Sequence, residues 1–213
     1  MMMRTALLTA FAALTFAAVP AGFTPIFNGK DLTGWHISQV NHHGKTQSWV
    51  VENGVLSGTQ DKPGHGGILL TDKRYKNFEV SIEIKPDFGC DGGLFLRSNE
   101  KGQAYQVMLD YLEKGDVGGI YGEGLKDVKG TRSNDYRKHW KTDDWNHIRA
   151  RIEGEVPRIQ VWLNGTQITD WTDTANHLVD GATDGMIAVQ VHLGNRWVEG
   201  GRHRFRNIAV KEL

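Results

Sequence analysis

The chain has 213 residues, and 25 basic residues balance 25 acidic ones, so its formal net charge is zero. No run of lysines or arginines breaks this balance, which argues against a nucleic-acid partner or an anionic membrane surface. The one cysteine, Cys90, cannot form an internal disulfide. Its turn-like setting, FGCDGG, offers no neighbouring base, so we interpret it as a packing residue.

The first 21 residues are typical of a secretory signal peptide. Arg4 supplies a positive charge, residues 5–19 form an uncharged apolar run, and Val19-Pro20-Ala21 is a small-x-small processing sequence. We expect cleavage after Ala21 and a secreted or periplasmic product with one domain over residues 22–213. The run is short beside the ~20 residues of a bilayer span, although an uncleaved N-terminal anchor is the alternative. No second apolar run follows, so no membrane span is expected after processing.

Apolar and polar residues alternate along most of the remaining chain, which indicates half-buried β-strands. The clearest alternating segments are residues 78–85, 145–153, 159–163, 187–193 and 205–210. Asn53-Gly54 and Asn164-Gly165 fall between alternating runs and predict tight hairpin turns. The period slips at Asn207, which predicts a β-bulge. No long amphipathic helix is evident, so we predict an all-β sandwich or jelly roll of two antiparallel sheets.

The apolar positions of these strands should fill the space between the two sheets. The residues expected there are Val80, Ile82, Ile148, Ile152, Val161, Leu163, Val189 and Val191. Residues 113–144 differ from the rest because they are polar and rich in Gly, Asp and Lys. Such long connections are often functional, so we expect this segment to border a cleft and to bring Tyr121 or Glu123 near its rim.

Several strands carry Arg, His, Gln or Trp where Ser, Thr or Lys would suffice for solvation. If these strands share a sheet, the side chains line one surface able to bind a sugar; an ordinary solvated sheet face is the alternative. Acids are disfavoured within strands, and a carboxylate beside Arg is either a structural ion pair or a tuned base. The candidate catalytic residues, expected on one sheet face in one cleft, are Glu83, Arg97, Asp110 and His192. The candidate substrate-binding residues are Gln106, Tyr121, Glu123, Arg149, Trp162, Gln190, His42 and His43.

Motifs of several enzyme classes are missing from the sequence. Residues 79–83 lack the aspartate and the spacing of the E-x-D-x-x-E strand of laminarinase-type glucanases. Neither a G-x-S-x-G elbow, an H-E-x-x-H pair, a phosphate-binding loop nor an EF-hand loop occurs. Ordinary two-carboxylate glycosidase chemistry therefore has no motif behind it.

Short sequence motifs along the whole of residues 24–213 resemble those of the 3-keto-disaccharide hydrolase domain family. The most specific are FNGKDLTGW at 27–35, QVH at 190–192 and FRNI at 205–208. This resemblance implies an exported bacterial protein with a concanavalin A-like jelly roll. Many members of the family carry Tyr-Glu-x-Gln followed by an Asp in the central strand. Here Asp110 matches, whereas Gln106 and Met108 replace the Glu and the Gln, so a mechanism that needs that Glu does not carry over.

The family name implies cleavage of a glycoside whose C3 hydroxyl has been oxidised to a ketone. The ketone acidifies the C2 proton, a base removes that proton, and the C1 substituent leaves by elimination, after which water can add. Such a site needs a carboxylate or His base, an electrophile and an acid near the leaving group. A divalent metal ion such as calcium could serve as the electrophile, although no cofactor is certain.

Two other functions stay open at this point. A lectin-like carbohydrate-binding module would use the same polar face and Trp residues to bind sugar without turnover. A structural or adhesion domain would carry a polar face that is only solvated. The sequence leaves the sugar, the choice between elimination and hydrolysis, and the oligomeric state undetermined.

Overall fold

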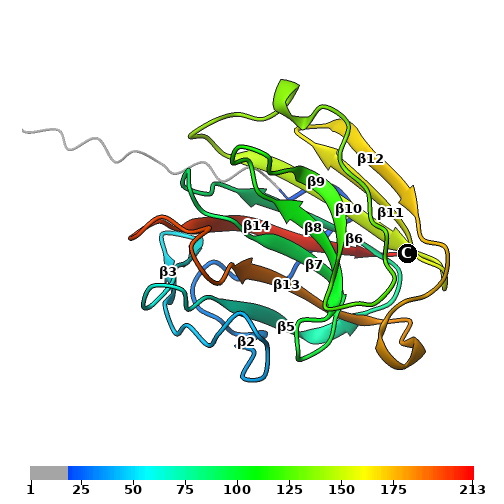
Figure 1. The fold of residues 1–213 in the computed structure, drawn as a ribbon, viewed down its shortest axis with the longest axis horizontal. Coiled ribbons are helices and arrows are strands. Elements are labelled where there is room, and N and C mark those ends of the chain that lie inside the picture. The colour runs from blue at the N-terminus through cyan, green and yellow to red at the C-terminus, as the bar shows by residue number, and fades with distance from the viewer. Residues whose placement is uncertain (1–18) are drawn as a thin grey trace, which may run out of the picture.

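Two antiparallel β-sheets lie face to face in the computed structural model, which describes residues 19–213 (Figure 1). Most of the predicted signal peptide therefore lies outside the described residues. The predicted fold class, a jelly-roll β-sandwich of two antiparallel sheets, is confirmed.

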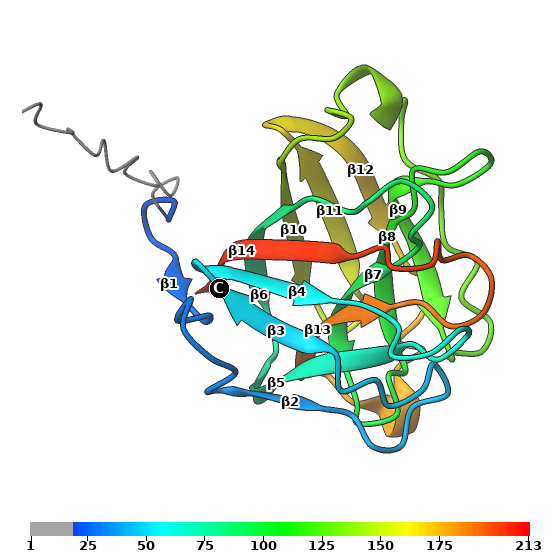
Figure 2. The ribbon, with the colours of Figure 1, turned by 90° about the vertical axis from the view of Figure 1, so that its left-hand side faces the viewer.

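The larger sheet has eight strands. Across this sheet the order is β12 (Thr166–Thr172), β11 (Arg158–Leu163), β10 (Asn146–Glu153), β6 (Phe78–Ile84), β14 (His203–Glu212), β4 (Val55–Gly58) and β3 (Trp49–Glu52), with β1 (Thr24–Pro25) paired to β14. The six-stranded sheet has the order β2 (Trp35–Ile37), β5 (Gly67–Tyr75), β13 (Gly185–Val191), β7 (Gly93–Ser98), β8 (Ala104–Leu109) and β9 (Val117–Glu123). Strand β14 pairs with β6 on one side and β4 on the other, and Figure 2 shows it beside β4, with β1 near the C-terminus. Two short 3-10 helices, η1 (Tyr136–Lys138) and η2 (Val179–Gly181), lie in the connections.

The alternation in the sequence correctly identifies the residues between the sheets. All eight residues expected there have no exposed surface. Both predicted hairpins form, because Glu52 pairs with Val55 and Leu163 pairs with Thr166 across their Asn-Gly turns. The bulge at Asn207 is also confirmed: its φ is 52°, and the register between β14 and β6 shifts there.

A second apolar cluster covers part of the outer face of the six-stranded sheet. Its buried members are Ile68, Leu70, Phe95, Ala104, Met186 and Ala188. The loop before β8 covers it so closely that a Cβ on Gly102 would lie 2.3 Å from the Cδ1 atom of Ile68. Loops therefore cover part of this sheet face. The polar residues beside the apolar cluster are shielded from water as a result.

Arg97 leaves the sheet face that the alternation predicts for it. It has a φ of 54° and lies where β7 and β13 lose regular register. Its guanidinium is buried and donates to the Lys76 carbonyl (2.6 Å), the Gly154 carbonyl (3.0 Å) and the Asn77 Oδ1 atom (2.9 Å). These acceptors belong to the β5–β6 and β10–β11 turns, so Arg97 ties the two sheets together. The expectation that it shares a face with Asp110 is wrong.

Replacing Arg97 by Met should therefore lower stability. Arg97→Met keeps most of the aliphatic stem but leaves three acceptors without their charged donor, which should cost about 3 kcal/mol or more of unfolding free energy. Urea denaturation measures this loss. The control is Arg149→Met, because Arg149 is partly exposed and packs over the Trp162 ring; this change should cost less than about 1 kcal/mol. Equal midpoints for Arg97→Met and the wild type would contradict the structural role.

His203 is a buried imidazole among aromatic rings. Its ring centroid lies 5.1 Å from Trp197 and 5.9 Å from Phe205, and its Nε2 atom bonds the Cys90 carbonyl at 3.1 Å. Burial lowers the pKa of His203 from 6.5 to about 4. The unfolded chain therefore takes up this proton at a higher pH than the folded chain does. The stability that His203 contributes is present above pH 6.5 and is lost as the pH falls toward 4.

Acid should accordingly destabilise the protein in a way that depends on His203. We expect a loss of about 2–3 kcal/mol from this one residue as the pH falls through that window. His203→Gln keeps an N–H donor for the Cys90 carbonyl and should remove this part of the pH dependence, which urea denaturation at several pH values measures. The same pH dependence in the variant would contradict the assignment.

Candidate functional site

Two glutamines form the centre of a polar cluster on the outer face of the six-stranded sheet. Gln106 on β8 and Gln190 on β13 are almost fully buried, and the Gln106 Nε2 atom donates to the Gln190 Oε1 atom at 3.2 Å. Strand β7 lies between them and passes beneath the amides as Gly93. A Cβ on Gly93 would lie 2.3 Å from the Gln106 Nε2 atom, so this contact requires glycine there.

The amide chain continues to a histidine and a glutamate. The Gln190 Nε2 atom lies 2.9 Å from Nε2 and 3.2 Å from Nδ1 of His43. Because the two ring nitrogens direct their lone pairs apart, an atom this close to both lies over the ring face. The His43 Nε2 atom lies 3.3 Å from the Glu123 Oε1 atom, and the His42 Nε2 atom lies 3.2 Å from the same oxygen.

The loop between β2 and β3 presents these two histidines in a fixed position. Ser38 bonds the Glu100 carbonyl at 2.6 Å, and the Asn41 Oδ1 atom accepts the His43 backbone N–H at 2.9 Å. Gly44 has a φ of 117°, and a Cβ there would lie 2.6 Å from the Gly66 carbonyl oxygen. The loop therefore packs tightly against the start of β5, and glycine permits the approach.

A second group of charged residues adjoins His43 through His192. The ring centroids of the two histidines are 5.4 Å apart. His192 donates from Nδ1 to the Leu193 carbonyl at 2.6 Å, so the neutral ring keeps its lone pair on Nε2. This Nε2 atom lies 3.9 Å from the Asp91 Oδ2 atom. Nε2 is therefore the ring nitrogen that lies nearer the Asp91 carboxyl group.

Arg196 connects two carboxyl groups at this end of the cluster. It donates to the Asp91 Oδ2 atom at 2.8 Å and also pairs with Asp110. Asp110 in addition accepts the Leu112 backbone N–H at 3.0 Å. Burial raises the pKa of Asp91, and the nearby Asp110 raises it further, while His192 and Arg196 act in the opposite direction. Burial therefore favours the protonated form of the Asp91 carboxyl more than a solvent-exposed position would.

Seven of the residues predicted from the sequence lie together in this cluster, and an eighth predicted residue, Tyr121, lies on the same sheet face. The seven are Asp110, His192, Gln106, Gln190, Glu123, His42 and His43. Tyr121 pairs directly opposite Gln106 in the β8–β9 ladder, so it projects from the same face, and it is 54% exposed. Strand β9 belongs to the long 113–144 segment, which therefore contributes Tyr121 and Glu123 to this face.

Three other candidates lie on the opposite side of the molecule. Glu83 is on β6, where it pairs with Arg206 on the outer face of the eight-stranded sheet. Arg149 on β10 packs over the ring of Trp162 on β11, with 3.9 Å between the guanidinium carbon and the ring centroid. The expectation that Glu83 shares a face with Asp110 is wrong. Alternation shows which residues of a strand share a side, but not which sheet the strand joins.

Asp91 and Arg196 were missed by the sequence reasoning because both lie in loops. Asp91 follows Cys90 in the Gly-rich turn before β7, and Arg196 lies between β13 and β14. The acidic residue within the Gly-rich turn FGCDGG is the sequence signal that could have identified Asp91 as a candidate. Cys90 itself is buried, and burial raises the pKa of its thiol to about 12, so the interpretation as a packing residue agrees with its surroundings.

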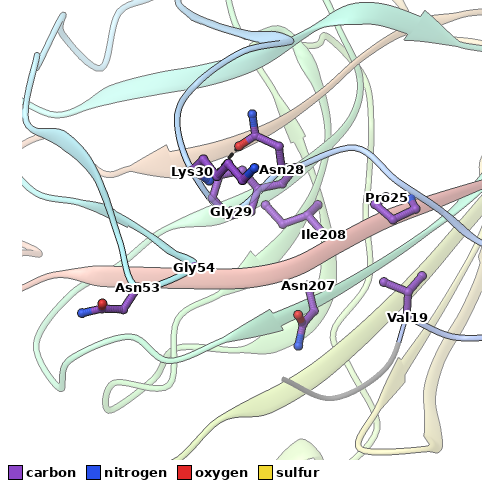
Figure 3. A pocket seen from close by; sticks show the side chains of 10 residues that line it. Val19, Pro25, Asn28, Gly29, Lys30, Asn53, Gly54, Asn207 and Ile208 are labelled. Carbon is purple, nitrogen blue, oxygen red and sulfur yellow. Dashed lines mark hydrogen bonds between the residues drawn. The ribbon is translucent and has the colours of Figure 1, made fainter. Parts of the chain in front are cut away.

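The two largest cavities described lie near turns of the sandwich. A cavity of about 650 Å³ lies beside the loop that carries Arg196; it is lined by residues 60–64, Gly194, Asn195, Trp197, Glu199 and Gly200. Gln60 connects it to the cluster by donating to the His192 carbonyl at 2.8 Å. Figure 3 shows the other cavity, of about 530 Å³, between the Asn28–Lys30 turn and Ile208. Lys30 is its only ionisable described lining residue, so this cavity offers little chemistry.

The comparisons with known proteins agree with this fold. A structure described as a putative glycosyl hydrolase from Parabacteroides distasonis is 22% identical with a TM-score of 0.64, covering 90% of this chain and 99% of that one. The carbohydrate binding module CBM66 from Bacillus subtilis is 16% identical with a TM-score of 0.59, covering 85% and 98%. Alginate lyase Aly36B is 16% identical with a TM-score of 0.56, covering 80% and 86%. At these identities the structures support the fold alone.

Sequence comparison gives the family. A curated 3-keto-disaccharide hydrolase from Bacteroides thetaiotaomicron is 31% identical over 87 residues, which are 37% of this chain and 28% of that protein. Among the described residues, no helix is long and apolar enough to cross a bilayer. The sequence model of the family described as the 3-keto-alpha-glucoside-1,2-lyase-like domain matches residues 22–211. Since this match covers nearly the whole chain and both descriptions concern carbohydrate-active enzymes, the chain belongs to the 3-keto-alpha-glucoside-1,2-lyase-like domain family.

Proposed function

We propose that the chain is an exported enzyme that cleaves 3-keto-glycosides on the outer face of its six-stranded sheet. One observation carries the proposal: the Leu193 carbonyl fixes the tautomer of His192, so a basic Nε2 atom lies 3.9 Å from the Asp91 carboxyl. Burial raises the pKa of Asp91. A nitrogen lone pair and a carboxyl group with a raised pKa beside each other suit the proton removal and proton donation of an elimination. The family description supports the substrate class.

The reaction begins with removal of a proton from C2 of the oxidised sugar. The His192 Nε2 atom takes this proton, and the electron pair of the C2–H bond passes toward the C3 carbonyl to give an enolate. The enolate then re-forms the ketone as a C1=C2 double bond develops and the C1–O bond breaks. The departing oxygen takes a proton from the Asp91 carboxyl. Addition of water across the double bond completes a net hydrolysis.

Asp110 has a supporting role in this proposal rather than that of the base. Its Oδ2 atom pairs with Arg196 and its Oδ1 atom accepts the Leu112 N–H, so both oxygens are engaged. Asp110 thereby holds Arg196 against Asp91. The Arg196 guanidinium provides positive charge beside the reacting groups, where it can stabilise the anionic transition state.

Sugar binding is assigned to the neighbouring strands. Tyr121 offers an exposed ring on which a sugar can stack. The cavity beside the Arg196 loop, with Trp197 and Lys62 in its lining, is suited to the group attached at C1. The Gln106–Gln190 pair forms the floor between them.

A non-catalytic carbohydrate-binding module is the second candidate. The similarity of the fold to a carbohydrate binding module and the exposed Tyr121 ring favour it. Under this alternative, His192 and Asp91 would bond sugar hydroxyls and transfer no proton. The two candidates differ in whether product forms, so one experiment separates them.

Cleavage should depend on the C3 ketone. Without the ketone, the C2 proton is too weakly acidic for an imidazole to remove. We therefore expect product from 3-keto-glycosides and none from the parent glycosides, as measured by mass analysis after incubation with purified protein. Equal cleavage of both would indicate ordinary glycosidase chemistry, and binding of both with cleavage of neither would indicate the binding module.

His192→Gln should abolish most of the turnover. Glutamine keeps polar contacts but cannot accept the C2 proton, so kcat should fall about 100-fold or more while KM changes little. The control is His65→Gln, because His65 is an exposed loop residue with no place in the cluster. Solvent deuterium incorporation at C2 provides a second readout, since the variant should also lose this exchange. Unchanged kcat and exchange would remove His192 from the role of base.

A further inference from the structure

We propose that His42, His43 and Glu123 bind a divalent first-row transition-metal ion. Each residue offers one ligand atom, and the three atoms all lie within 4.8 Å of one another. Two imidazoles and a carboxylate favour ions such as Zn²⁺, Co²⁺, Mn²⁺ or Fe²⁺, whereas Ca²⁺ prefers a shell of oxygens. The calcium considered in the sequence analysis therefore does not suit these residues.

The two distances from the Glu123 carboxylate to the histidine nitrogens match those between neighbouring ligands of one ion. The Glu123 Oε1 atom lies 3.2 Å from the His42 Nε2 atom and 3.3 Å from the His43 Nε2 atom. Bonds of about 2.0–2.1 Å to a tetrahedral ion place neighbouring ligand atoms about 3.3 Å apart. Both distances exceed the roughly 2.9–3.0 Å at which N–H···O hydrogen bonds are most common. The carboxylate oxygen therefore lies at the expected ligand spacing from both imidazole nitrogens, and all three atoms are close enough together to surround one ion.

The contacts of His43 and Glu123 leave the lone pairs of their ligand atoms available for an ion. The Gln190 amide lies over the face of the His43 ring, so it does not block the in-plane lone pair of Nε2. The Glu123 side chain is only 11% exposed. Within residues 19–213, no Lys or Arg lies within 4.0 Å of its carboxylate, whose only ion-pair partners are the two histidines. A buried carboxylate requires a positive partner, and a bound cation would supply one.

The surrounding structure holds the ligands in position before any ion binds. The His43 backbone is fixed by Asn41, and the ring is supported by Gln190, which Gln106 holds in turn. Such outer contacts set ligand orientation in metal sites. The His42 side chain is 58% exposed, so the outer side of the cluster is open and an ion there could accept further ligands from solvent or substrate.

The location relative to His192 gives the ion a chemical role, and this part of the inference rests on the proposed function. The His43 ring centroid is 5.4 Å from that of His192. An ion held by His43 would lie near a sugar whose C2 proton His192 removes. When bound, it would polarise the C3 ketone and stabilise the enolate oxygen as a Lewis acid.

Metal binding can be tested without substrate. The purified chain is treated with a chelator, freed of it, and titrated with Co²⁺ by calorimetry while the visible absorption of the ion is recorded. We expect one Co²⁺ per chain and an absorption change typical of nitrogen coordination in a low-symmetry site. Glu123→Gln preserves the shape of the side chain, and His42→Ala alters an exposed residue. Each should weaken Co²⁺ binding about 100-fold or more, because each removes a direct ligand and loss of an outer contact alone costs 10–100-fold.

His36→Ala is the matched control. His36 also lies between two carboxylates, Asp72 at 2.6 Å and Glu100 at 3.1 Å, but it uses a different ring nitrogen for each, so the ligand atoms do not converge. This variant should bind Co²⁺ as the wild type does. Unfolding midpoints and far-UV dichroism establish that all variants are folded. Absence of Co²⁺ binding by the wild type, or equal binding by Glu123→Gln, would overturn the site.

The two proposals fail separately in this design. A chain that binds Co²⁺ at these residues but leaves 3-keto-glycosides intact would reject the proposed reaction and keep the metal site. A chain that binds no Co²⁺ but cleaves 3-keto-glycosides equally well before and after chelation would keep the reaction and reject the site.

Discussion

The backbone carbonyl of Gly92 can only accept hydrogen bonds, and it lies 3.4 Å from the Gln106 Nε2 atom. This contact sets which end of the Gln106 amide points toward Gln190, and therefore which end of Gln190 reaches His43. A buried amide with the wrong orientation would place like groups against each other, which is costly in a desolvated site. The group that lies against the His43 ring, the Gln190 amide nitrogen, follows from this one direction.

The charged residues on the two outer faces of the sandwich differ in how they are paired. On the eight-stranded sheet, Glu79 is paired with Arg149 and Arg151, and Glu83 is paired with Arg206. Acid and base are matched there by neighbours in the ladder, which leaves little to react. Around the Gln106–Gln190 pair on the six-stranded sheet, the acids lie against imidazoles, amides and the bridging Arg196, in surroundings that loops partly exclude from water. Proton transfer is favoured on the face where the carboxyl groups are not all paired with cationic side chains.

The fold could be predicted well from the sequence, because period-two alternation depends on local burial. Val80, Val161 and Val189 face inward as their neighbours in sequence require. The site could be predicted only in part. Gln106 and Gln190 were found from their parity, but nothing local places β6 in one sheet and β8 in the other, so Glu83 was grouped with Asp110. Arg97 shows a second limit, since its positive φ turns the side chain away from the face that alternation assigns to it.

The place of β14 in the larger sheet determines when the fold can be completed. This strand pairs with β6 on one side and β4 on the other, while β1 also pairs with it. All three partners are synthesised well before it, and they cannot close their sheet until it arrives. Pairing over such long sequence separations forms slowly. A nascent chain of this topology would therefore remain open during its synthesis, which is compatible with the export proposed above, because exported chains are commonly threaded through a membrane channel before they fold.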